Sequence, residues 1–307
     1  MTNLEYNSDE RQSIGVRTIP RMPGIEELRK DFEEYQKELR LGKMKEKRGK
    51  GEEEEGEREE DKKVNINSNI TLSDYVFTGV KGISGKEALV SKFEYPNANN
   101  KNYEDTHKFV LSNGLYVPTP AIFMPHFTNV VKAYETRNQK NPNLLLDGNE
   151  NPITGKELED IYMHLTKDHI STYSTGQNGA WTWLNARFVQ GTGFNNMDLE
   201  TITGIDKQGN LIVNKTPLDN CEWSDSYINL DFNSQGLAKS KFAKQEYSQG
   251  KNVYFYRPRL NFVARFIALS GRVDFVCFRG ATFADPSLGV FTSTEGASAT
   301  REIRSLK

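Results

Sequence analysis

The sequence is poor in cysteine, with only Cys221 and Cys277 among its 307 residues. Two thiols cannot build a disulfide framework, so we expect both to be reduced and buried instead of bridged. The sequence also lacks an apolar run long enough for a membrane-spanning helix. Its first residues lack the basic start and the apolar stretch of a signal peptide, so we expect no membrane insertion.

A net charge of one sign is absent as well, because 40 basic residues nearly balance 42 acidic ones and leave a charge of −2. This balance excludes a general attraction to nucleic acids or to anionic membranes. A basic run at residues 43–50 is short, and the glutamates of 52–55 follow it closely. We therefore expect no nucleic-acid partner.

The familiar catalytic and metal-binding motifs are missing. The sequence has no HExxH, CxxC, EF-hand or GxSxG pattern. His164 and His169 lie five residues apart, which places them about 140° apart on a helix instead of on one zinc-binding face. The glycine-rich stretch 79–86 has the wrong spacing for a phosphate loop, and Glu87 stands where that loop needs Ser or Thr. We expect no catalytic residue, no metal and no cofactor.

The first 63 residues are predicted to form an arm ahead of the folded domain. An amphipathic helix over 24–42 is indicated by apolar residues at spacings of three and four, namely Ile25, Leu28, Phe32, Tyr35 and Leu39. This helix is interpreted as a docking or self-association helix, or as one packed on its own domain. Residues 42–63 hold eight basic and nine acidic side chains and one apolar residue, Met44, so we expect a disordered tether.

Two helices are predicted in the middle of the chain. One spans 121–137, and its inward residues are Phe123, Phe127, Val130, Val131 and Tyr134. The other begins after Thr154, which matches a capping box with Glu157, and its apolar residues are Leu158, Ile161, Tyr162 and Leu165. Glu159 and Asp160 are interpreted as solvated charges on its surface. A third, short helix is expected over 237–247.

Strands are predicted around these helices. The folded domain is expected to begin near Val64 with short strands. Residues 109–111 and 116–117 flank Asn113 and Gly114, which favours a β-hairpin. Residues 199–205 and 210–213 flank a turn and indicate two paired strands.

The stretch 272–278 alternates with a period of two and predicts a strand. One face consists of Val273, Phe275 and Cys277, which suit a core. The other face consists of Asp274, Val276 and Phe278, which suit contact with a ligand more than solubility. A strand buried on both faces is the alternative that periodicity leaves open.

Around this strand, short segments that form a fixed frame are interrupted by positions whose residues are unlike one another, here called the unlike positions. The frame consists of Arg257-Pro258-Arg259, Val263-Ala264-Arg265-Phe266, Ser270-Gly271-Arg272, Cys277, Arg279 and Leu288-Gly289-Val290. The unlike positions are Phe262, Ile267, Leu269, Asp274, Val276, Phe278, Gly280, Thr282, Phe283, Ala284 and Asp285. This pattern resembles the variable protein of a diversity-generating retroelement, of the archaeal or archaeal-virus type. The stretch from Trp181 to Phe188 is similar to the constant part of such proteins, and the resemblance covers residues 121–291.

The resemblance implies an α+β, C-type-lectin-like fold, related to the formylglycine-generating enzymes, with small twisted antiparallel sheets and two main helices. The domain would span 64–291, with a variable region at about 253–291. The residues after Phe291 are small and polar, so we expect a flexible tail at 292–307. In this family, error-prone reverse transcription rewrites codons at template adenines, and asparagine codons changed in this way cannot encode Lys, Glu, Gln, Met or Trp. None of these five occurs between Asn252 and Phe291, where ordinary composition gives roughly eight or nine.

The resemblance further implies binding without catalysis. The eleven unlike positions would form a variable face for a macromolecular ligand, a protein or a surface glycan, and the chain would be cytoplasmic or virion-associated. Two alternatives stay open at this point. One is a formylglycine-generating-type oxidase that uses Cys221 and Cys277. The other is a structural protein of a virion or envelope that is not diversified.

Overall fold

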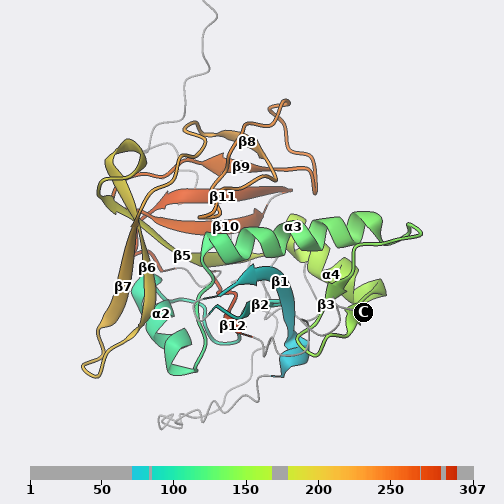
Figure 1. Ribbon diagram of the computed structural model, residues 1–307, viewed down its shortest axis with the longest axis horizontal. Coiled ribbons are helices and arrows are strands. Elements are labelled where there is room, and N and C mark those ends of the chain that lie inside the picture. Colours follow the sequence, from blue (N-terminus) through green and yellow to red (C-terminus); the bar gives the residue numbers. More distant parts are fainter. Residues whose placement is uncertain (1–70, 83–84, 168–178, 270, 285–287, 296–307) are drawn as a thin grey trace, which may run out of the picture. The chain divides into compact units, whose positions relative to one another are not determined.

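The computed structural model describes residues 71–82, 85–167, 179–269, 271–284 and 288–295 (Figure 1). All of them belong to one unit of the chain, Ser68–Lys307. The expected arm, the helix over 24–42, the tether over 42–63 and the domain start near Val64 lie outside these residues. Among the described residues, no helix is both long and apolar enough to cross a membrane.

The fold is mixed α+β and is centred on a seven-stranded sheet (Figure 1). In spatial order its strands are β7 (Leu211–Pro217), β6 (Met197–Ile205), β5 (Trp181–Gln190), β10 (Val263–Leu269), β11 (Arg272–Arg279), β9 (Asn252–Tyr256) and β8 (Ser226–Asn229). Only the pair β9 and β11 is parallel within this sheet. The sheet is thus larger than the small antiparallel sheets that we expected.

Within the described part of the chain, two smaller sheets and three α-helices accompany it. The smaller sheets consist of β1 (Tyr75–Lys81), β2 (Glu87–Ser91) and β12 (Ser293–Glu295), and of β3 (Leu145–Leu146) and β4 (Pro152–Ile153). The α-helices are α2 (Tyr103–Ser112), α3 (Pro120–Thr136) and α4 (Gly155–Thr166). Single 3₁₀ turns lie at η1 (Leu72–Asp74) and η2 (Phe194–Asn196).

The alternation of β11 is confirmed on its inner side. Val273, Phe275 and Cys277 are fully buried in the main core. The neighbouring strand β10 contributes Phe266 to the same layer, because Phe266 is the direct partner of Phe275 across the ladder. Successive residues of a strand point to opposite faces, so these side chains define the inner face of the sheet.

Helix α3 covers that inner face, as its spacing predicted. Phe123 and Phe127 place their rings 4.9 and 5.2 Å from the ring of Phe266. Helix α4 is also confirmed, but its capping box is wrong, because the Thr154 side chain makes no capping hydrogen bond. Glu157 instead accepts a hydrogen bond from Lys92 Nζ at 2.5 Å.

A second hydrophobic core lies on the outer face of the sheet, over strands β6, β5 and β10. Trp183 belongs to this second core, while its neighbour Leu184 belongs to the main core. Tyr103 and Val110 of α2 pack into the second core, and α2 contacts β6 and β7. Helix α2 therefore covers the outer face near β6 and β7, and no other helix of the described residues lies over the outer face of β8, β9 and β11 (Figure 1).

Four further expectations are corrected by the structure. The hairpin predicted around Asn113 and Gly114 is wrong, because α2 occupies residues 103–112 and these two residues end it. Asn102 caps the helix by accepting a hydrogen bond from Asp105 N at 2.9 Å. The buried positions of α2 recur at helical spacing, namely Tyr103, Thr106, His107 and Val110. The Asn-Gly pair thus marks a helix end, where Gly114 has a φ of 72°.

The helix expected over 237–247 is also wrong. Leu237 follows a tight turn in which Asn233 Oδ1 accepts hydrogen bonds from Gln235 N and Leu237 N. Ala238 and Lys241 then form isolated bridges with Phe232 and with Ile228 in strand β8. Backbone pairing with the sheet therefore replaces the local hydrogen bonds of a helix.

The last two corrections concern a tail and a carboxylate. The tail at 292–307 was expected to be flexible, but its first residues form β12 on β2, and Thr292 and Ser293 are buried. Residues 296–307 lie outside the described part. Asp160, interpreted as a solvated charge, is buried and forms an ion pair with Lys156 Nζ at 2.5 Å.

Candidate functional site

The candidate site is the outer face of four neighbouring strands, in the spatial order β8, β9, β11 and β10, together with the start of β5. Cross-strand pairing aligns one row of outward residues over five strands, namely Tyr227, Tyr254, Asp274, Ile267 and Trp181. Every member of this row is half-buried. Partly exposed aromatic and apolar side chains in register across a sheet offer contact area that a partner can cover.

Four aromatic rings, here called the aromatic ladder, run over this face. Ring centroids lie 5.0 Å apart for Tyr227 and Tyr254, 4.8 Å for Tyr254 and Tyr256, and 5.0 Å for Tyr256 and Phe278. All three pairs meet edge to face, the arrangement that aromatic quadrupoles favour. The ladder is therefore held in one arrangement before any ligand arrives.

Arginines surround the aromatic ladder. Arg272 places its guanidinium 5.5 Å from the ring centre of Tyr254 and donates a hydrogen bond to Tyr256 Oη at 3.3 Å. Arg259 and Arg279 lie 4.6 and 5.3 Å from the ring centre of Phe278. Cation–π contacts of this kind orient a guanidinium without neutralising it.

Two aspartates accompany these arginines. Asp274 Oδ1 lies 3.0 Å from Arg272 Nε, and Asp225 Oδ2 lies 3.0 Å from Arg259 Nη2. Burial raises the pKa of Asp274, although the positive charges of Arg272 and Arg279 oppose that shift. Burial likewise lowers the pKa of Arg279. The site therefore combines a largely shielded carboxylate with guanidinium groups that solvent can reach.

The expected exposure of Val276 is wrong. Only 2% of this residue is exposed, although it lies on the outer face. Its direct neighbours across the strands are Tyr256 and Arg265, whose longer side chains close over it. Arg265 is itself 1% exposed and lies between the rings of Trp183 and Phe283, 4.3 and 4.5 Å from their centres.

The other predicted positions fall into three groups. The half-buried ones are Phe262, Ile267, Asp274, Phe278, Gly280 and Phe283, and the exposed ones are Thr282 and Ala284. The side chain of Leu269 and the whole of Asp285 lie outside the described residues. Strands β10 and β11 bring Ile267, Asp274 and Phe278 onto one face, while Phe283 follows in the loop and packs over Arg265.

Sequence reasoning missed the three tyrosines of the aromatic ladder. Tyr254 and Tyr256 alternate with the buried Val253 and Phe255, so a period of two was present in the sequence. The parallel pairing of β9 with β11 joins residues far apart in the chain and has no local signal.

The two cysteines lie in one core instead of in a cleft. Cys277 is buried, and the half-buried Cys221 packs against the same cluster. Burial raises the pKa of Cys221 to about 12, and it raises the pKa of Cys277 well above its usual value. Both thiols are therefore held protonated at neutral pH, which disfavours nucleophilic and metal-binding roles. Within the described residues, no group of three or more His, Cys, Asp or Glu is placed to hold a metal ion.

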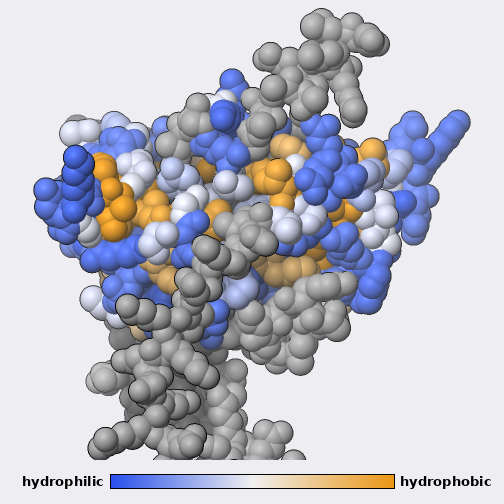
Figure 2. Space-filling view, turned by 90° about the horizontal axis from the view of Figure 1, so that it is seen from below, coloured by the Kyte–Doolittle hydropathy of each residue, from blue (hydrophilic) through white to orange (hydrophobic). Residues whose placement is uncertain are grey.

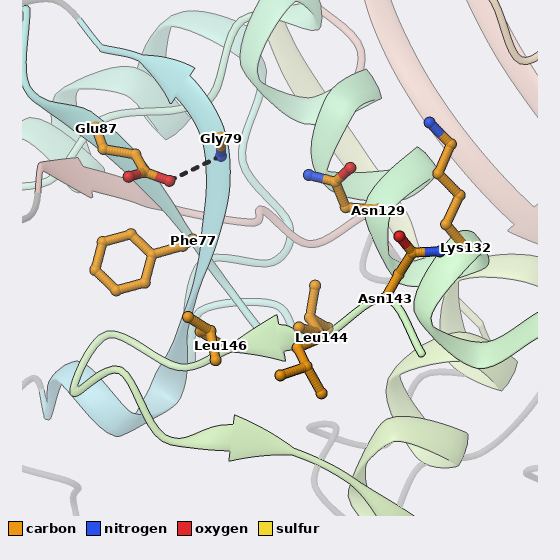
Figure 3. A pocket seen from close by; sticks show the side chains of 9 residues that line it. Phe77, Gly79, Glu87, Asn129, Lys132, Asn143, Leu144 and Leu146 are labelled. Carbon is orange, nitrogen blue, oxygen red and sulfur yellow. Dashed lines mark hydrogen bonds between the residues drawn. The ribbon is translucent and has the colours of Figure 1, made fainter. Parts of the chain in front are cut away.

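A separate cavity of about 180 Å³ lies between β1, α3 and β3 (Figure 3). Its apolar wall includes Phe77 and Leu144, and Leu144 is 63% exposed. Two of the polar side chains around it are already engaged, since Asn129 donates to Thr78 O and Glu87 accepts from Gly79 N. None of the eleven positions that we expect to vary lines this cavity. From below, exposed hydrophobic side chains form small patches among hydrophilic ones (Figure 2).

Comparisons of the chain with protein-family models, with curated proteins and with solved structures give no match. A function for this chain must therefore be inferred from the geometry and chemistry of the outer face.

Proposed function

We propose that this protein is a hypervariable ligand-binding protein diversified by a retroelement, and that its outer face binds a protein partner without catalysis. One observation carries the proposal. On strand β11, the core positions Val273, Phe275 and Cys277 are fully buried, whereas the alternating positions Asp274 and Phe278 are partly exposed. Variation on one side of such a strand leaves the core untouched.

The anchoring of the two variable strands supports this role. β10 and β11 lie inside the seven-stranded sheet, with β5 on one side and β9 on the other. Phe266 and Phe275 fix the pair from below through the main core. Substitutions at partly exposed positions of a rigid scaffold cost less stability than substitutions in its core, so many sequences would still fold.

The chemistry of the face favours a protein ligand. Tyrosine, arginine and phenylalanine dominate it, and tyrosine and arginine are the residues that most often carry binding energy at protein interfaces. The aromatic ladder supplies rigid area at a low entropy cost, and the arginines around it add polar contacts. A C-type-lectin-like fold, in which helices cover one side of a twisted sheet and variable residues lie on the other, accommodates this arrangement.

A selection experiment tests the proposal. A phage-displayed library of random peptides is selected on the full-length protein, and each enriched clone is then measured against the Phe278→Ser variant. Lys215→Gln is the matched control, because Lys215 is exposed on the edge strand β7 at the far end of the sheet. We expect the enriched clones to lose binding to Phe278→Ser and to keep it to Lys215→Gln. Clones that bind both variants equally would contradict a binding role for this face.

A further inference from the structure

We infer that Arg272 and Arg279 bind a carboxylate group of the partner protein, and that the residue at position 274 sets how strongly an acidic partner is held. This inference rests on the proposed binding function and specifies the chemistry of the ligand at the same face.

The charged groups at this point form a cluster that is joined through the aromatic rings of the face. Arg272, Asp274 and Arg279 belong to one strand, and Tyr256 lies beside them on β9. Arg272 is joined to Asp274 through an ion pair of 3.0 Å and to the Tyr256 hydroxyl through a hydrogen bond of 3.3 Å. The Arg279 guanidinium lies 5.3 Å from the ring centre of Phe278, and that ring lies 5.0 Å from the ring of Tyr256.

The cluster is not neutral. Two guanidinium groups face one carboxylate, and within the described residues no ion pair joins Arg279 to an acidic side chain. Arg272 is partly exposed, with 44% of its side chain accessible, whereas the Asp274 side chain is only 15% accessible. The positive charge is thus available to a partner, while the compensating negative charge lies beneath it.

A carboxylate suits this cluster better than a neutral or cationic group. A guanidinium offers parallel N–H donors that match the two oxygens of a carboxylate. The aromatic ladder next to the cluster can receive an apolar side chain of the same partner, so an acidic residue beside an aromatic or aliphatic one is the expected recognition element.

Position 274 has a special place in this cluster. It belongs to the variable positions, whereas Arg272 and Arg279 belong to the frame. An aspartate here accepts hydrogen bonds from the Arg272 guanidinium and competes with the carboxylate of a ligand, because both carboxylates bind the same N–H groups. A neutral residue at 274 releases Arg272 and leaves two uncompensated cations. One changing side chain between two constant arginines therefore adjusts the preference for acidic partners.

Binding of poly-L-glutamate and poly-L-lysine to the full-length protein at low ionic strength tests the inference by calorimetry. We expect poly-L-glutamate to bind and poly-L-lysine not to bind. Arg279→Gln should weaken poly-L-glutamate binding about tenfold, as expected for the loss of one hydrogen-bonded charge pair. Asp274→Asn should strengthen it about tenfold, because Arg272 becomes available.

Two variants control for net charge alone. Lys215→Gln removes one positive charge at the edge strand β7, and Glu104→Gln removes one negative charge on α2, which packs against β6 and β7 at the far end of the sheet. Both should change the affinity less than about twofold. The inference is overturned if Arg279→Gln matches Lys215→Gln, if Asp274→Asn matches Glu104→Gln, or if poly-L-lysine binds better.

A failure of the carboxylate inference is distinguishable from a failure of the proposed function. Peptides that depend on Phe278, together with a negative poly-L-glutamate result, would remove the carboxylate preference and leave the binding face in place. Poly-L-glutamate binding that depends on Arg279, together with peptides that ignore Phe278, would support an anion site and contradict the wider face.

Discussion

Serine substitutions at three positions of β11 should lower stability in a graded order. Phe275 lies in the main core, with its ring 5.4 Å from that of Phe255, and is fully buried. Val276 points to the outer face but is covered by Tyr256 and Arg265. Phe278 is half-buried and contacts Tyr256 and the guanidiniums around it.

The expected costs follow from these surroundings. Emptying the site of Phe275 costs about 3–5 kcal/mol, and the buried serine hydroxyl adds about 1 kcal/mol or more. Val276→Ser loses a smaller buried side chain and should cost about 2–3 kcal/mol. Phe278→Ser loses one aromatic pair and exposed cation–π contacts, which together amount to about 1–2 kcal/mol.

Thermal unfolding of the three variants measures this order. For a domain of this size, each kcal/mol lowers Tm by about 2–4 °C, so Phe275→Ser should melt more than about 8 °C below the parent. Phe278→Ser should stay within about 8 °C of it, and its shift should be at most about half that of Phe275→Ser. Equal melting temperatures for Phe275→Ser and Phe278→Ser would refute the assignment of Phe278 to a binding face.

Three further predictions concern buried groups. Burial lowers the pKa of His126 from 6.5 to about 3, so the stability that its neutral form contributes is complete above pH 6.5 and is lost as the pH falls toward 3. In urea unfolding, His126→Phe should therefore reduce the slope of the unfolding free energy against pH by about 1.4 kcal/mol per pH unit between pH 6.5 and 3. An unchanged slope would contradict a buried, neutral His126. Asn185→Ala should cost about 2–4 kcal/mol in the same assay, because Asn185 bonds both Ile202 N and Ile202 O at 2.7 Å, and a cost below about 1 kcal/mol would count against it. Thiol alkylation of the native protein near pH 7 should be slow at Cys277 and Cys221, since burial raises both pKa values, whereas rapid labelling of Cys277 would show an accessible thiol.

Local periodicity was sufficient to predict much of the fold. Helices α3 and α4 followed from apolar residues at helical spacing, and β11 followed from alternation. These signals depend on side chains near one another in the chain, so they are readable without tertiary knowledge. The paired strands β6 and β7 belong to the same group, because Leu199 and Thr216 pair across a short hairpin.

Tertiary context determined what the sequence did not predict. Val276 is buried because its partners across the ladder are a tyrosine and an arginine, and that pairing is not visible in one strand. The Asn113-Gly114 pair ends a helix here, although the same dipeptide often forms a hairpin turn. Ser293 joins a sheet through contacts with Val90 and Tyr116, which precede it by most of the domain.

Sequencing this gene in many members of one natural population tests the central claim most directly. If a retroelement diversifies the outer face, substitutions will concentrate at the variable positions, such as Ile267, Asp274 and Phe278, and will introduce no Lys, Glu, Gln, Met or Trp there. The fully buried Val273 and Phe275 will stay constant. Substitutions spread evenly over buried and exposed positions of β10 and β11 would contradict the account.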